Sequence, residues 1–198
     1  FEQRSFLYNY SCTNQIYTNE EIGGAGTINS IAFMPATVNA ASRNLDIYMV
    51  NSEKTSFAGA TDWTPVTDAD LVYSGTVNWT ANAWSTITLT TPFQFDGTNL
   101  IVVVNDKTGS WTSSNSYKAD AATAQAIRIY QDASAYNPSA PGNGTVIDFK
   151  NQIKLDITYG AGGGNDNPYT PATWSNILPK DMETTVILNA QVPDASPE

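Results

Sequence analysis

The chain of 198 residues contains no histidine and a single cysteine, Cys12. These absences exclude Ser-His-Asp and Cys-His catalysis, histidine-bearing zinc sites, CxxC redox pairs and internal disulfide bonds. Cys12 is therefore expected to be a small buried hydrophobe. Carboxylate chemistry, including hard metal ions bound through oxygen, stays open.

Basic residues are also scarce. The chain has 9 Lys and Arg against 19 Asp and Glu, which gives a formal net charge of −10. A nucleic-acid interface needs a basic face to neutralise phosphates, and anionic lipid needs the same, so neither partner is expected. No apolar run approaches the roughly 18 residues of a membrane-spanning helix, so no membrane insertion is predicted.

The residues that are present suit a secreted globular domain. Hydrophobic residues make up 41% of the chain, enough for a core, and charged residues only 14%. Thr, Ser and Asn dominate the polar remainder, which favours a β-rich protein of the extracellular space or cell surface. The sequence begins with Phe1 instead of Met, as a processed precursor would, although a truncated sequence would begin the same way.

A hydrophobic period of two dominates the chain and predicts strands. In residues 44–50, Leu45, Ile47 and Met49 share one face, and Tyr48 lies on the other. Residues 84–90 and 151–159 alternate in the same way, which predicts half-buried antiparallel strands. Residues 100–104, LIVVV, are apolar on both faces and predict a central strand. Further strands are predicted at 6–10, 27–33, 72–77, 126–130 and 145–149.

Turn motifs separate these runs at short intervals: GGAG, DGTN, DKTG and NPSAPGNG. Short strands with this punctuation predict an all-β fold, an antiparallel jelly-roll β-sandwich over residues 1–159. Helix is scarce, and single turns are predicted only after Thr18 and at residues 67–71.

The organisation changes at residue 160, where GAGGGNDNP has the composition of a flexible linker. Residues 160–198 are predicted to form this linker and an extended tail with one strand, at about 184–190. A lone strand is not stable. It must pair with its own sheet, with a neighbouring domain or with another copy, and these alternatives stay open.

Five stretches carry a resemblance to a known family: residues 8–33, 43–57, 61–79, 84–111 and 149–160. Together they resemble a repeat module of secreted, multidomain surface proteins of the Bacteroidetes, including adhesin and protease-associated proteins. The module is similar to the jelly rolls of cleaved-adhesin and galactose-binding-like domains. The resemblance implies export and a binding or structural role without catalysis. It does not extend beyond Gly164.

Carboxylates provide the candidate metal site. Asp68 and Asp70 could offer two ligands to Ca²⁺, which takes about six to eight oxygens. The alternative is that they cap a short turn. Asn105 and Asp106 follow a buried strand and could form a site at the rim of the sheet, but the Asx chemistry of a hairpin turn explains them better. No pair of carboxylates stands out as a glycosidase pair. No enzyme activity is expected, and calcium is the one candidate cofactor.

Exposed aromatic residues provide the candidate glycan site, because sugar rings stack on Trp and Tyr. Strand parity predicts that Trp84, Tyr48 and Tyr130 face outward, and Trp111 lies in a Ser/Thr-rich loop. The alternative is that these rings stack across neighbouring strands. Trp79 is predicted to be core.

The tail provides the candidate assembly residues, Val186, Ile187 and Leu188. Burial in the sheet of a second copy would contribute about 1.5–3 kcal/mol for each, and a repeated head-to-tail contact yields a filament. The leading hypothesis is a secreted structural or adhesive protein, a subunit of an extracellular filament or adhesin joined through this strand. The alternative is a carbohydrate-binding accessory module.

Overall fold

The computed structural model describes residues 2–5, 8–39, 42–111 and 115–159, and the structural statements below concern these residues. The tail, residues 160–198, lies outside them. The elements in chain order are β1 (Glu2–Ser5), β2 (Tyr10–Tyr17), α1 (Asn19–Ile22), β3 (Gly26–Phe33), β4 (Pro35–Thr37), β5 (Ser42–Ser52), the 3-10 turn η1 (Asp68–Asp70), β6 (Leu71–Asn78), β7 (Ser85–Phe95), β8 (Asn99–Asp106), β9 (Asn115–Gln131), β10 (Thr145–Asn151) and β11 (Ile153–Tyr159).

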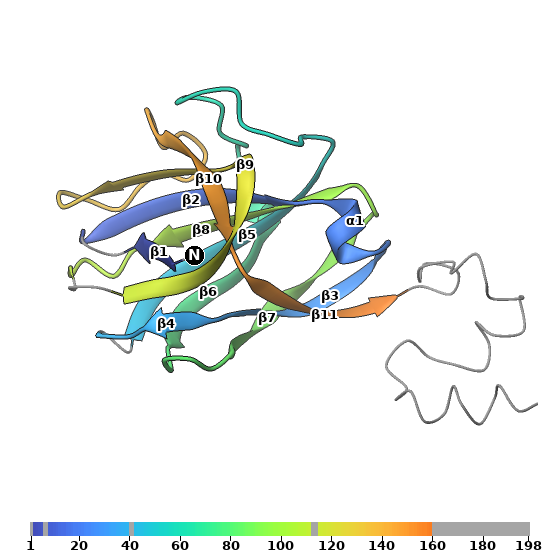
Figure 1. Ribbon diagram of the computed structural model, residues 1–198, viewed down its shortest axis with the longest axis horizontal. Helices are drawn as coiled ribbons and strands as arrows, with labels where there is room; N and C mark the ends of the chain where they lie inside the picture. The colour runs from blue at the N-terminus through green and yellow to red at the C-terminus, as the bar shows by residue number, and fades with distance from the viewer. Residues whose placement is uncertain (1, 6–7, 40–41, 112–114, 160–198) are drawn as a thin grey trace, which may run out of the picture.

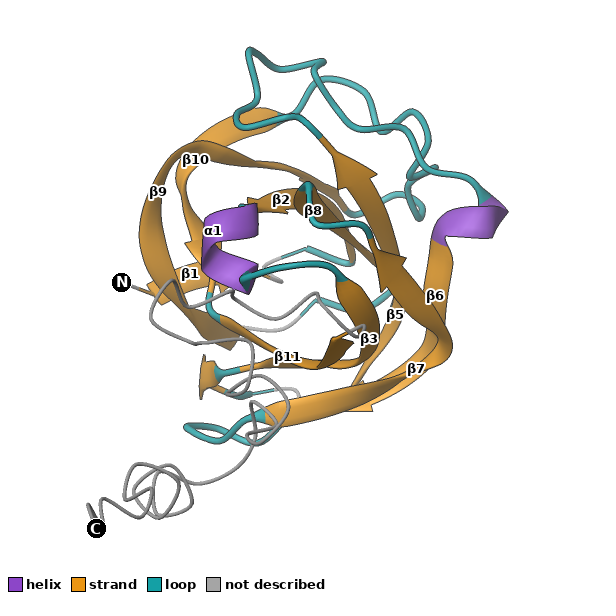
Figure 2. Ribbon diagram, turned by 90° about the vertical axis from the view of Figure 1, so that its right-hand side faces the viewer, coloured by secondary structure: helices purple, strands orange, loops and turns teal. Residues whose placement is uncertain are grey.

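The strands form two curled antiparallel sheets that enclose a common core (Figures 1 and 2). The larger sheet has eight strands in the order β1-β9-β2-β8-β5-β6, with β10 and β4 also paired to β9. The smaller sheet has three, in the order β11-β3-β7. The predicted all-β antiparallel sandwich is therefore confirmed.

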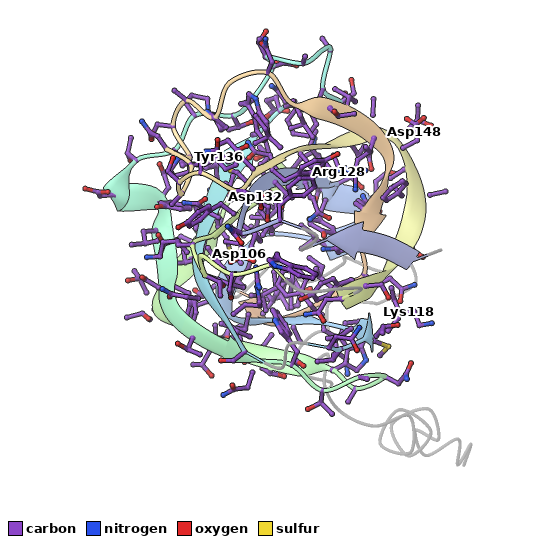
Figure 3. The ribbon with its side chains drawn as sticks, turned by 90° about the vertical axis from the view of Figure 1, so that its left-hand side faces the viewer. Asp106, Lys118, Arg128, Asp132, Tyr136 and Asp148 are labelled. Carbon is purple, nitrogen blue, oxygen red and sulfur yellow. The ribbon has the colours of Figure 1, made fainter. Side chains whose placement is uncertain are left out.

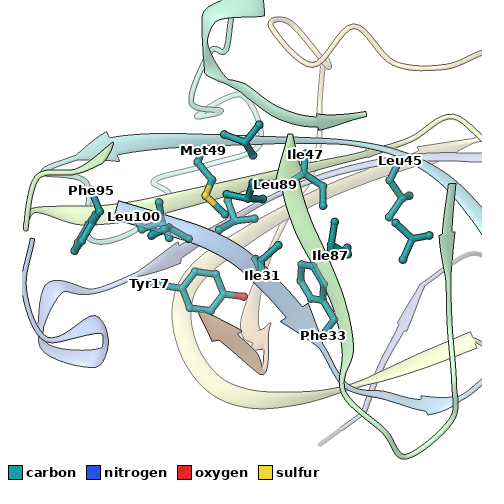
Figure 4. Close-up of a cluster of buried hydrophobic side chains, with 14 of the residues drawn as sticks. Tyr17, Ile31, Phe33, Leu45, Ile47, Met49, Ile87, Leu89, Phe95 and Leu100 are labelled. Carbon is teal, nitrogen blue, oxygen red and sulfur yellow. The ribbon is translucent and has the colours of Figure 1, made fainter. Parts of the chain in front are cut away.

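The main core lies between the sheets, as Figure 4 shows for Ile31, Ile47, Leu89 and Leu100. The predicted inward residues of β5 and β7 all lie in it. Trp79 is core as predicted. Its ring packs edge-on against Phe33 and Tyr117, with centroids 6.2 and 5.3 Å away.

A second apolar cluster covers the outer face of the larger sheet, where the sequence predicted solvent. Tyr48 is only 7% exposed and packs with Phe57 and Val66, so its predicted outward exposure is wrong. The loop after β5 and the loop after β9 lie over this face, joined where Trp63 Nε1 donates to the Gly142 carbonyl at 2.6 Å. Alternation identified the face correctly but not the loops that cover it.

The short strands β1 and β4 were not predicted, nor were most of β2 and the first half of β9. β2 and the first half of β9 carry small and polar residues, and Asn14 and Gln15 of β2 are buried. Asn14 Nδ2 donates to the Thr64 carbonyl at 3.1 Å, and Gln15 Oε1 accepts from the Asn151 N–H at 2.6 Å. These hydrogen bonds allow polar side chains in the interior.

The other boundaries follow the predictions with small shifts. The strand predicted at 6–10 is wrong for Tyr8 and Asn9, which lie in a bend, since β2 begins at Tyr10; residues 6–7 lie outside the described part. The helical turn after Thr18 is confirmed, with a capping box between Thr18 and Glu21. Gly23 ends it at a φ of 89°, where glycine is favoured.

Candidate functional site

A groove of about 470 Å³ runs along β11. It lies on the side of the sandwich where the chain passes from β10 in the larger sheet to β11 in the smaller sheet. Its walls come from β11, α1, the ends of β2 and β10, Asp120 of β9 and Trp84 just before β7. The lining residues are Tyr17, Glu21, Ile22, Trp84, Asp120, Lys150, Asn151, Gln152, Ile153, Lys154, Leu155, Ile157 and Tyr159.

β11 is the edge strand of the smaller sheet, beside β3 (Figure 2). Its pairing with β3 runs from Ile153 opposite Phe33 to Tyr159 opposite Gly26. In the described part of the chain, no strand pairs with the other edge of residues 153–158. The apolar row Ile153, Leu155 and Ile157 packs against the core but stays only half-buried. Residues 153–158 therefore combine an edge with which no described strand pairs and apolar side chains that are incompletely covered.

Lys150 holds the opposite wall in place. It is only 4% exposed, and its ammonium donates to the Ile16 carbonyl at 2.9 Å, to Glu21 Oε2 at 2.6 Å and to Gln125 Oε1 at 2.7 Å. Three acceptors satisfy the three donors of a buried ammonium. The contacts tie β10 to β2, β9 and α1, so this wall is preorganised.

Two tyrosines fix the two ends of the groove strand: Tyr17 holds the residue at the end of β10, just before β11, and Tyr159 is itself the last residue of β11. Tyr17 Oη donates to the Asn151 carbonyl at 2.8 Å, and Tyr159 Oη donates to the Ile22 carbonyl at 3.0 Å. Burial, followed by the charges of Glu21 and Asp120, raises the pKa of Tyr17 well above its usual value. The Tyr17 phenol is therefore a neutral hydrogen-bond donor.

Trp84 lies at one end of the groove and is 36% exposed. The Lys154 ammonium lies 5.7 Å from its ring centroid, a cation–π contact. Gln152 Nε2 donates to Asp120 Oδ1 at 2.8 Å in the same groove. Trp84 is the one predicted glycan-contacting residue that lines this groove.

The other aromatic candidates lie elsewhere. Trp111 is 66% exposed in the loop after β8. Tyr130 is 45% exposed, and its ring stacks on Tyr8 with centroids 4.1 Å apart and an interplanar angle of 18°. The Arg128 guanidinium lies 5.9 Å from the Tyr130 ring, on the side shown in Figure 3. The stacking alternative thus describes Tyr130, and the four rings do not form one platform.

The candidate metal residues act in turns. Asp70 Oδ2 accepts from Thr67 N at 2.8 Å and Thr67 Oγ1 at 2.9 Å, so the capping alternative holds for Asp70. Asp68 is exposed, and no group of three Cys, Asp or Glu that could hold a metal occurs among the described residues. Calcium at Asp68 and Asp70 stays a prediction.

Asp106, labelled in Figure 3, is fully buried. It is paired with Arg43, whose Nη2 lies 2.7 Å from Asp106 Oδ2. Its other oxygen accepts from Thr108 N at 2.9 Å, as the turn alternative predicts. Both carboxylate oxygens of Asp106 are therefore bound within the protein, and Asp106 has a structural role. The hypothesis of a site at the rim of the sheet is wrong for Asp106.

Sequence reasoning missed the groove as a site, although it assigned β11 correctly. The signal was the run from Ile153 to Tyr159, the last alternating strand before the linker. Lys150 gave no signal, since its partners come from β2, α1 and β9. The predicted assembly residues Val186, Ile187 and Leu188 lie outside the described residues.

Comparisons with protein-family models, curated proteins and solved structures gave no match. In the described part of the chain, no helix is long and apolar enough to cross a membrane. The functional argument therefore rests on the groove and its chemistry.

Proposed function

We propose that this protein is a secreted, non-enzymatic structural or adhesive protein of the cell surface whose groove along β11 receives an extended strand. The observation that carries the proposal is the edge of residues 153–158 with which no described strand pairs, together with the half-buried apolar row of β11. An added strand would bond its backbone to that edge and insert alternate side chains into the groove. Exposed edges of this kind are usually blocked by charge or covered.

The tail supplies a strand of the required chemistry. Val186, Ile187 and Leu188 lie in a segment of high β-propensity, and each contributes about 1.5–3 kcal/mol if fully buried. Insertion into the groove of another copy is a head-to-tail contact, which propagates into a filament unless it closes into a ring.

The carboxylates in the groove support a role without catalysis. Glu21 is bonded to Lys150 and to the Thr18 N–H, and Asp120 accepts from Gln152. A glycosidase needs one carboxyl group as acid and a second as base or nucleophile, both free to act on the substrate.

Light scattering and negative-stain images of the 198-residue chain and of a chain ending at Tyr159 test the proposal. We expect multimers that grow with concentration from the full chain and monomers from the shorter one. Leu155→Lys, which places a charge in the apolar row, should abolish multimers, whereas Asp156→Lys on the exposed face of the same strand should not. Circular dichroism establishes that both variants fold. Multimers that survive Leu155→Lys would contradict the role of the groove.

Carbohydrate binding is the second candidate, favoured by the partly exposed Trp84 ring beside polar side chains in the groove. Trp84→Ala should then weaken retention on a glycan array about 10-fold or more, since stacking on the ring is lost. Trp111→Ala, at the other exposed tryptophan, is the matched control. Binding that disappears only when residues 160–198 are removed would count against this candidate.

A further inference from the structure

The strand-receiving groove lies next to the point where the tail leaves the domain, because Tyr159 both ends β11 and lines the groove. We infer that, in the isolated protein, residues 184–190 of the same chain occupy the groove and close the subunit. Assembly then requires exchange of this segment for that of a neighbour. The inference rests on the proposed function, since it names the occupant of the same groove.

The length of the intervening chain supports occupation by the same chain. The seven residues of β11 span about 23 Å at roughly 3.3 Å per residue. Treated as a flexible coil, the 24 residues from 160 to 183 would have an end-to-end distance of at least about 27 Å. A linker whose length matches the span gives the highest effective concentration, on the order of millimolar.

A second copy competes poorly with this tether. At micromolar protein, the segment of a neighbour is about a thousand times more dilute than the tethered one. The entropy of closing the loop opposes insertion of the tethered segment only weakly, because each doubling of loop length costs about 0.6 kcal/mol. The closed monomer should therefore dominate in dilute solution.

The pattern of the segment fits the groove. Val186, Leu188 and Ala190 fall on one face with the period of two that spaces Ile153, Leu155 and Ile157. A connection of 24 residues exceeds the dozen or so that parallel strands need.

The test uses the full chain as the gel-filtration monomer, with a fluorescent peptide of residues 181–192 as probe. Leu188→Asp puts a charge on the inserted face and should open the groove. Asn189→Asp adds the same charge on the opposite face and is the matched control. We expect the Leu188→Asp variant to bind the peptide about 100-fold more tightly than the wild type or the control, because it has little competing segment. Amides of β11 should also exchange hydrogen faster in that variant.

The outcomes separate this inference from the proposed function. Equal peptide affinity for wild type and Leu188→Asp would overturn self-occupation, while multimers from the full chain would still support the strand-receiving role. If the Leu188→Asp variant binds the peptide and the wild type never forms multimers, self-occupation is supported and the filament is overturned. Absence of peptide binding by every variant would overturn both.

Discussion

At the residue scale, Asp106 shows how one side chain can serve both a turn and the interior. Its Oδ1 accepts from the Thr108 N–H at 2.9 Å, and its Oδ2 accepts from Arg43 Nε at 2.8 Å. Arg43 also donates from Nη1 to the Ser110 carbonyl at 2.8 Å, which holds the loop after β8. Neither Arg43 nor Asp106 is exposed, so the pair is stable only while both charges are present.

Asp106→Asn should lower the free energy of unfolding by about 3–5 kcal/mol, because it leaves the Arg43 guanidinium buried without its counter-charge. Urea denaturation measures the loss. Asp96→Asn is the matched control, since Asp96 accepts from Thr98 N at 2.9 Å in an equivalent turn and its side chain is exposed. Its loss should stay below about 1 kcal/mol. Equal losses at the two positions would show that the Arg43 pair contributes little.

At the scale of the element, β11 depends on close contact with β3. A Cβ on Gly26 would lie 2.8 Å from both Ile157 Cγ2 and the Thr158 carbonyl oxygen. The pairing also shifts register between Asp156 and Ile157. A glycine at position 26 therefore sets how near the groove-forming strand lies to the rest of its sheet.

Gly26→Ala should destabilise the protein by about 1–3 kcal/mol, because the added methyl group overpacks the backbone of β11. Hydrogen exchange should rise first in β11 and chemical denaturation gives the overall loss. Gly59→Ala is the control, since a Cβ there meets nothing within 4 Å. It should change stability little. Unchanged exchange in β11 of Gly26→Ala would mean that the strand tolerates the displacement.

At the scale of the whole molecule, burial of ionisable groups couples stability to alkaline pH. Burial raises the pKa of the Cys12 thiol from 9.0 to about 12, and that of Tyr48 from 10.0 to about 12. The unfolded chain therefore loses these protons at lower pH than the folded protein does. The stabilisation is complete below about pH 9 and falls as the pH rises towards 12.

The free energy of unfolding should fall between pH 9 and 10.5 by about 1.4 kcal/mol per pH unit for each proton released only on unfolding. Urea titrations across this range measure the slope. Cys12→Ala removes one such proton, so its slope should be shallower even though the variant starts less stable. Parallel slopes for wild type and Cys12→Ala would show that the thiol does not contribute.

The sequence by itself determined the strands and their faces wherever alternation was regular. Ile87 and Leu89 are buried and Thr88 is exposed, as their parity requires, because successive side chains of a strand point to opposite sides. LIVVV was identified as central because both of its faces are apolar. The turn at Thr18 was readable because a capping box is a local hydrogen-bond pattern.

Only the tertiary structure decided what covers each face and which strand lies at an edge. Tyr48 is buried by Phe57 and Val66 of the loop after β5. The alternation within β5 does not tell which residues cover its outer face. The groove arises because β11 joins a sheet of three strands opposite a sheet of eight. Edges, clefts and buried ion pairs depend on contacts between distant segments, and a local periodicity does not encode those contacts.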